Sequence, residues 1–75
     1  MTKITNAEQF GKAIRAKRKK LGYTQSRLAG YCNCSVMFLS DLERGKPTAE
    51  LGKAIKVINT LGIDLIARDR SEASS

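Results

Sequence analysis

Apolar residues recur at helical spacing along most of the chain, and capping residues divide this pattern into short helices. The first helix is expected to begin at a capping box formed by Thr5 and Glu8 and to continue to about Lys20. Gly22 follows as a left-handed C-terminal residue. The apolar stripe of this helix consists of Phe10, Ala13, Ile14 and Leu21.

Two shorter helices follow. Thr24 can cap a helix that runs through about Cys32, and Asn33 then suits a left-handed turn position. Ser35 can cap the next helix, which ends at Gly45. Leu28 and Ala29 of the former helix are expected in the core.

A fourth helix is expected between a cap at Thr48 and a stop at Gly62. Pro47 separates it from the preceding helix, which a proline cannot continue. Its predicted apolar stripe consists of Leu51, Ala54, Ile55, Ile58 and Leu61.

After Gly62 the period changes from helical spacing to alternation, which is typical of a short β-strand. The alternating residues are Ile63, Asp64, Leu65, Ile66, Ala67 and Arg68. A single strand cannot satisfy its own backbone groups, so pairing with the same strand of a second copy is the simplest solution. An extended, frayed tail is the alternative. Residues 69–75 are expected to be disordered.

These elements predict an all-α fold, a bundle of four to five helices with a short C-terminal strand paired across a dimer. The chain of 75 residues is one domain, expected to span residues 1–68. A chain this small buries only roughly 60% of its unfolded surface, so a partner subunit would add to a marginal core.

The charge of +7 favours a polyanionic partner, either nucleic acid or an anionic membrane surface. A solvated helix face is the simpler explanation for the densest basic run. That run comprises Lys12, Arg15, Lys17, Arg18, Lys19 and Lys20. The membrane alternative is weak because the apolar stripe of the same helix is needed for the core.

The sequence lacks the residues of the common catalytic arrangements. Histidine is absent, which excludes Ser/His/Asp and Cys/His arrangements, so no enzyme activity is expected. Cys32 and Cys34 supply only two of the four ligands of a structural zinc site, and are interpreted as packing or turn residues. No cofactor is expected.

No apolar run approaches the ~20 residues that a membrane span needs. The N-terminal residues also lack the apolar stretch of a secretory signal. A cytoplasmic protein is therefore expected.

Two short helices joined by a tight turn, from Thr24 to Arg44, outline a helix-turn-helix. The most specific segments are Gly-Tyr-Thr-Gln at residues 22–25 and Leu-Glu-Arg-Gly-Lys at residues 42–46, because their separation also matches a family pattern. With them, the chain from about Phe10 to Leu65 resembles the Cro/phage-repressor (XRE) helix-turn-helix family. The resemblance implies a repressor-like fold and binding to double-stranded operator DNA.

The segments Ser-Asp-Leu-Glu-Arg-Gly-Lys-Pro-Thr and Leu-Gly-Ile-Asp-Leu resemble the HipB-type antitoxin branch of that family. The branch implies a C-terminal strand that pairs across a dimer, repression of the protein's own operon, and binding to a HipA-type kinase toxin. Three alternatives stay open: a regulator without a toxin, a general nucleic-acid binder, and a module that acts mainly through protein interactions.

The helix from Ser35 to Arg44 is expected to enter the major groove, with Leu39 and Leu42 on its buried side and Cys34 and Phe38 beside them. The family resemblance implies that four positions face base edges: Val36, Met37, Ser40 and Asp41. Apolar side chains at the first two positions suit thymine methyl groups. Asp41 could instead pair with Arg44 and orient it.

Phosphate contacts are expected around this helix, since such contacts set the register of a protein on DNA. Thr24, Gln25, Ser35, Arg44 and Lys46 are the candidates. Gln25 resembles the family's phosphate-binding glutamine. The resemblance also implies an ion pair between Arg18 and Glu43 that holds the recognition helix against the first helix.

Overall fold

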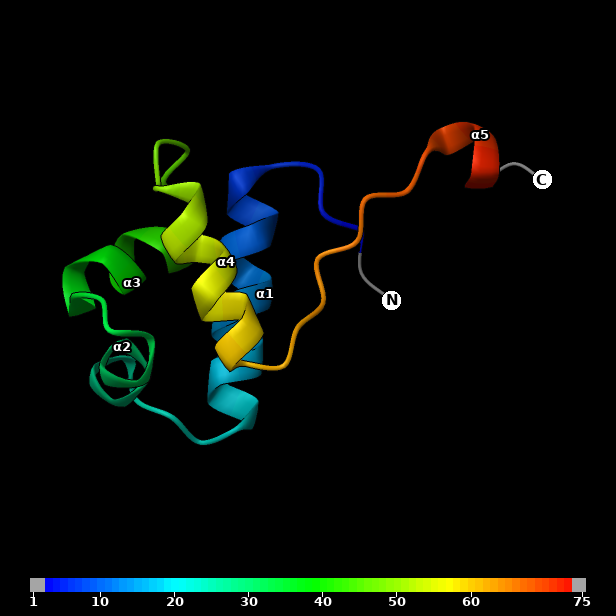
Figure 1. Cartoon of the computed structure of the whole chain (residues 1–75). Helices are drawn as coiled ribbons and strands as arrows, with labels where there is room; N and C mark the ends of the chain where they lie inside the picture. The colour runs from blue at the N-terminus through cyan, green and yellow to red at the C-terminus, as the bar shows by residue number, and fades with distance from the viewer. Residues whose placement is uncertain (1–2, 74–75) are drawn as a thin grey trace.

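The computed structural model describes residues 3–73, and five helices lie within them (Figure 1). They are α1 (Ala7–Lys20), α2 (Gln25–Cys32), α3 (Val36–Glu43), α4 (Leu51–Thr60) and α5 (Arg70–Ala73). The first four form one body, and the chain beyond α4 leads away from it to α5 (Figure 1). The all-α class is confirmed, and residues 3–73 of this single chain contain no strand.

The predicted C-terminal ends of the four helices are confirmed. Asn33 follows α2 in the left-handed region at φ 55°, and its backbone N–H donates to carbonyls of the last turn. Gly22, Gly45 and Gly62 have positive φ values after α1, α3 and α4. These residues let the chain reverse direction between helices, which brings α2 and α3 together at the tight turn.

The predicted N-cap of α1 was wrong by one residue. Asn6 caps the helix, with its Oδ1 accepting from the Gln9 backbone N–H at 2.8 Å. Gln9 reaches back to accept from the Thr5 backbone N–H at 2.7 Å. Thr5 and Asn6 are both capping residues, and Gln9 completes a reciprocal pair one position later than Glu8 would have done.

The predicted N-cap of α4 was also wrong. Glu50 caps this helix, and its carboxylate accepts from the backbone N–H groups of Gly52 and Lys53 at 3.2 and 2.6 Å. Thr48 lies in a turn after Pro47, closed by a bond from the Ala49 N–H to the Lys46 carbonyl. That turn delays the start of the helix.

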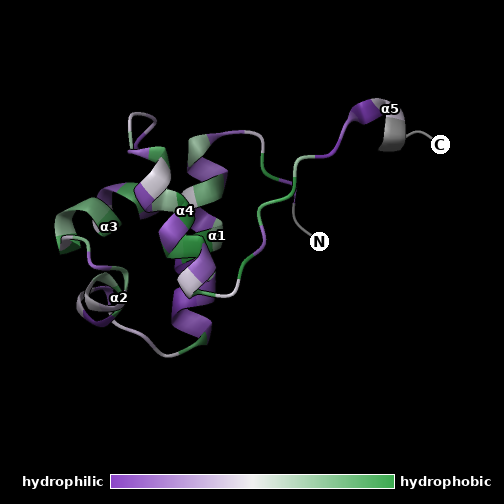
Figure 2. Cartoon of the chain, viewed as in Figure 1, coloured by the Kyte–Doolittle hydropathy of each residue, from purple (hydrophilic) through white to green (hydrophobic). Residues whose placement is uncertain are grey.

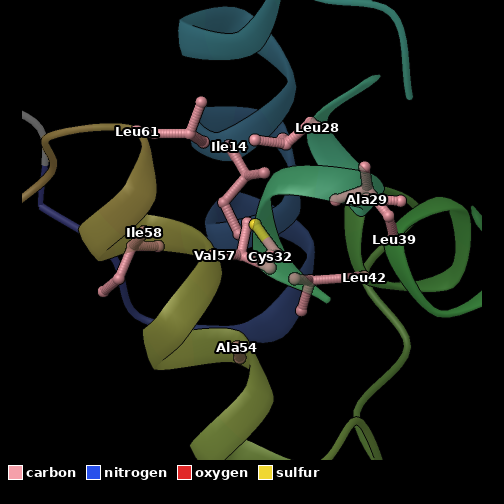
Figure 3. Packing of buried hydrophobic residues seen from close by; sticks show 10 residues of the cluster. All are labelled: Ile14, Leu28, Ala29, Cys32, Leu39, Leu42, Ala54, Val57, Ile58 and Leu61. Carbon is pink, nitrogen blue, oxygen red and sulfur yellow. The ribbon is translucent and has the colours of Figure 1, made fainter. Parts of the chain in front are cut away.

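Ten buried apolar side chains from all four helices of the body and from its turns form the core (Figure 3). They are Ile14, Leu28, Ala29, Cys32, Leu39, Leu42, Ala54, Val57, Ile58 and Leu61. Leu21 and Leu51, predicted as stripe residues, are exposed because they stand at the ends of α1 and α4. Val57, absent from the predicted stripe, is fully buried, whereas Ile55 is only half-buried.

Gly11 allows α1 to lie directly against the end of α3. A Cβ atom at this position would lie 2.4 Å from the Leu42 carbonyl oxygen and 2.6 Å from that of Glu43. Both neighbours are backbone atoms, which cannot move aside as a flexible side chain can. α3 is therefore positioned against α1 by a contact between their backbones.

Gly11→Ala is expected to lower the free energy of unfolding by about 1–3 kcal/mol, because the added methyl group overpacks the α1–α3 contact. Gly30→Ala is the matched control. A Cβ atom at Gly30 meets nothing within 4 Å, so alanine should stabilise α2 by about 0.5–1 kcal/mol. Urea unfolding measures both. Equal stability of the two variants would contradict the close approach.

The segment after α4 begins as part of the body and then leaves it. Ile63 is half-buried, packs against the core, and its N–H donates to the Ile58 carbonyl at 2.8 Å. Leu65 and Ile66 are 62% and 69% exposed. Within the described residues 3–73, this segment pairs with no other strand. The predicted partner is the same segment of a second copy, so the paired strand stays a prediction.

The region expected to be disordered contains α5. Asp69 precedes this helix, and its Oδ1 accepts from the Ser71 backbone N–H at 2.8 Å. Residues 74–75 lie outside the described part of the chain. Between residues 3 and 73, no helix is long and apolar enough to cross a membrane.

Candidate nucleic-acid interface

α2 and α3 meet through a turn of three residues, 33–35. The Cys34 N–H donates to the Ala29 carbonyl at 3.0 Å, and Ser35 Oγ accepts from the Phe38 N–H at 3.0 Å. Leu39 and Leu42 then anchor the inner side of α3 in the core. This arrangement turns the opposite side of α3 toward solvent, as a helix that enters a groove requires.

The predicted base-reading residues share this outer face. Val36 and Met37 are 44% and 73% exposed at the start of α3, while Ser40 and Asp41 are half-buried one turn later. Each apolar residue is therefore followed four positions on by a polar one. The structure brings the four together, and their contacts with bases stay a prediction.

Asp41 forms ion pairs with Arg44 and Lys46, two of the residues predicted to bind DNA phosphates. Its Oδ1 accepts from Arg44 Nη2, and its Oδ2 lies 3.6 Å from Lys46 Nζ. The predicted pair of Asp41 with Arg44 is therefore present, and a contact of Asp41 with a base stays a prediction. The Asp41 side chain is 23% exposed, whereas those of Arg44 and Lys46 are more than half exposed.

Asp41→Asn is expected to strengthen binding to mixed-sequence DNA by up to about fivefold, since an exposed ion pair is worth roughly 0.2–1 kcal/mol. The change frees two cations for phosphates and removes a negative charge from the interface. Asp64→Asn removes the same charge from the exposed C-terminal segment and serves as the control. Fluorescence anisotropy measures the affinities. Weaker binding by Asp41→Asn would contradict a competition between Asp41 and phosphate.

The predicted pair between Arg18 and Glu43 is present and buried. Arg18 donates from Nε to Glu43 Oε2 at 2.6 Å and from Nη2 to Oε1 at 3.0 Å. The two side chains are 9% and 3% exposed. The hydrogen bond to Glu43 raises the pKa of Arg18 above its ordinary value, so the guanidinium stays charged.

Two further bonds extend this pair to α2. Arg18 Nη1 donates to the Tyr23 carbonyl at 2.8 Å, and Gln25 Nε2 donates to Glu43 Oε1 at 3.1 Å. Sequence reasoning missed the bond between Gln25 and Glu43, because side chains 18 positions apart give no periodic signal. The predicted phosphate ligand is therefore held by the same carboxylate that joins α1 to α3.

Thr24 and Ser35 have clear structural roles. Thr24 Oγ1 accepts from the Arg27 N–H at 3.0 Å and so caps α2, as Ser35 caps α3. Both residues are exposed at helix N-termini, where backbone N–H groups favour an anion. Their contact with phosphate stays a prediction.

Sequence reasoning also missed part of the surface beside α3. An open groove is lined from α1 by Glu8, Lys12 and Arg15 and from the other side by Gln25, Ser40, Glu43 and Arg44. From the sequence, Lys12 and Arg15 are members of the basic run and carry no predicted contact. Their spacing of three, with Glu8 four positions before Lys12, is the signal that places them on one helix face.

The cysteines are both free thiols. Cys32 is buried in the core, and Cys34 is half-buried in the turn. Burial raises the pKa of the Cys34 thiol, which disfavours a reactive thiolate. Across residues 3–73, His, Cys, Asp and Glu side chains form no cluster of three or more suited to a metal ion.

A family model for helix-turn-helix proteins matches residues 14–67. The chain belongs to the helix-turn-helix family, in its XRE type. The HTH-type transcriptional regulator y4mF of Sinorhizobium fredii is 40% identical over 67 residues, which cover 87% of this chain and 88% of the relative. As an XRE-type helix-turn-helix protein, the chain is a DNA-binding transcriptional regulator.

Solved structures of HipB share the fold of this XRE-type regulator. A chain of the HipA–HipB–O2–O3 complex has a TM-score of 0.84 and 25% sequence identity, covering 92% of this chain and 97% of its own. A chain of the HipB–O4 20mer complex gives the same values. The predicted likeness to HipB is confirmed at the level of the fold.

Proposed function

We propose that this regulator is a homodimeric repressor that binds double-stranded operator DNA with α3 in the major groove. The observation that carries the proposal is the outer face of α3, which exposes Val36 and Met37 beside the cations Arg44 and Lys46. The apolar pair would contact thymine methyl groups, and the cations would bind the flanking phosphates. The net charge of +7 supports the same partner.

The dimer would form through the segment from Ile63 to Arg68. Its extended backbone and its exposed Leu65 and Ile66 suit pairing with the same segment of a second copy. Residues 1–68 would then form the DNA-binding and dimerising unit, and residues 69–75 would be dispensable for both roles. The protein would act in the cytoplasm.

The HipB likeness supports a finer role, that of an antitoxin which represses its own operon and binds a HipA-type kinase. A regulator without a toxin partner is the second candidate. It is supported by the relative y4mF, an HTH-type transcriptional regulator. Neither candidate needs an enzyme activity in this chain.

A footprint on the DNA upstream of the protein's own coding sequence tests the repressor role. A two-fold dimer predicts two protected half-sites separated by about one helical turn, roughly 10 base pairs, or a multiple of it. Protection of one asymmetric site by a monomer would contradict the dimeric reading.

Co-expression with a kinase encoded beside the gene tests the antitoxin role. The antitoxin candidate predicts that the two proteins co-purify and that growth arrest by the kinase is relieved. A chain truncated after Arg68 is the control, and it should still bind the kinase if binding needs only the body and the extended segment. A kinase that neither binds nor is neutralised would leave the stand-alone regulator as the function.

A further inference from the structure

One face of α1 lies along the end of the recognition helix. Glu8, Gly11, Lys12, Arg15 and Arg18 occupy positions i, i+3, i+4, i+7 and i+10, which share a face. At two points of this contact, a glycine lies directly against the backbone of the other segment. A Cβ atom at Gly11 would lie 2.4 Å from the Leu42 carbonyl oxygen, and one at Gly45 would lie 2.6 Å from Glu8 Cα.

This contact places α1 cations beside the predicted phosphate ligands. Lys12 and Arg15 line one wall of the groove, and Gln25, Ser40 and Arg44 line the opposite wall. Arg15 stands one turn after Gly11, the residue at which the backbones of α1 and α3 approach each other. Figure 2 shows that the C-terminal half of α1, beyond these residues, is also strongly hydrophilic.

The charges of the groove leave one cation without an internal partner. Glu43 is bound by Arg18 and Gln25, and Lys12 pairs with Glu8 at 3.2 Å. Arg44 is held by Asp41. Arg15 is exposed, and its guanidinium makes no hydrogen bond or ion pair with the described residues 3–73.

We propose that Arg15 binds a phosphate of the DNA backbone and makes α1 a third element of the interface, beside α2 and α3. The inference rests on the proposed binding of DNA. A guanidinium is suited to this role because it donates two parallel hydrogen bonds to phosphate oxygens. Glu8 opposes the contact, since it neutralises Lys12 and adds a negative charge to the groove.

The test compares Arg15→Gln with Lys20→Gln in binding to a mixed-sequence duplex of about 30 base pairs, which spans two half-sites. Lys20 is an exposed cation of the same helix, about 140° around its axis from Arg15. Arg15→Gln is expected to weaken binding at least fivefold and to reduce the log–log salt slope by about 0.9 for each protomer. Lys20→Gln is expected to change the affinity by less than about twofold and to leave the slope unchanged.

Glu8→Gln should act in the opposite direction. It is expected to strengthen binding and steepen the slope, because Lys12 becomes available to phosphate. Circular dichroism should show that all three variants are folded, as each side chain is exposed.

Equal affinities and slopes for Arg15→Gln and Lys20→Gln, with intact binding by the unchanged protein, would overturn this inference alone. Failure of the unchanged protein to bind any duplex would overturn the proposed function together with it.

Discussion

Glu43→Ala is expected to lower the free energy of unfolding by about 3–5 kcal/mol, the typical effect of removing one partner from a buried ion pair. The variant leaves the Arg18 guanidinium without its carboxylate at a position where its side chain is 9% exposed. It also frees Gln25 Nε2, which donates to the same carboxylate. Domains of this kind have only about 5–15 kcal/mol of stability, so the loss is a large share of the total.

The same substitution should weaken DNA binding beyond its effect on folding. Glu43 joins α1, α2 and the end of α3, so its loss releases both the recognition helix and the predicted phosphate ligand Gln25. Chemical unfolding and anisotropy, the latter at a temperature where the variant is folded, separate the two effects.

A double variant provides the matched control for Glu43→Ala. Arg18→Met with Glu43→Leu removes both charges and keeps apolar volume, which is often neutral or stabilising in comparable cases. This variant should recover most of the stability and leave Gln25 without its acceptor. A stability loss for Glu43→Ala of less than about 1 kcal/mol, no more than an exposed pair contributes, would contradict the role given to the pair.

Truncation after Asp64 is expected to give a folded monomer whose operator affinity falls by at least about 100-fold. Linking two binding units typically raises affinity by 10²–10⁴. Removing the segment that joins them therefore loses that gain. The cut retains Ile63, whose N–H donates to Ile58 and whose side chain packs on the core, so the body keeps its contacts. Sedimentation analysis and anisotropy measure the two results.

Truncation after Arg68 is the control for length. It removes α5 and keeps the extended segment, so both dimerisation and DNA binding should match the full chain. Leu65→Asp with Ile66→Asp should reproduce the monomer without any truncation, since both side chains are exposed in the single chain. Dimers that persist after truncation at Asp64 would show that the copies associate through another surface.

The sequence predicted the helical body because local signals there agree with the packing. Asn33 and Gly45 stand where left-handed residues end α2 and α3, and Leu28 and Leu39 fill the core at helical spacing. The errors at Thr5 and Thr48 arose where neighbouring residues compete to cap the same helix. Asn6 caps α1 because Gln9 completes the reciprocal bond one position later than Glu8 would. Glu50 caps α4 because the turn after Pro47 delays the start of that helix.

The candidate site was predictable only where residues lie close in the chain or match the family pattern. The outer face of α3 follows from helical spacing, and the pair of Arg18 with Glu43 follows from the family resemblance. The link from Gln25 to Glu43 and the place of Arg15 in the groove depend on how α1 crosses α3. That crossing is set by the backbone contact at Gly11, which no sequence period reveals.

Selection of bound sites from a library of random duplexes most directly tests whether α3 reads DNA as one half of a two-fold dimer. The unchanged protein should enrich a two-fold symmetric motif with half-sites about 10 base pairs apart, containing thymines at the positions that face Val36 and Met37. Val36→Ala with Met37→Ala should keep the half-site spacing and lose the preference at those thymines. An unchanged motif in the variant, or no enriched motif with the unchanged protein, would contradict the account.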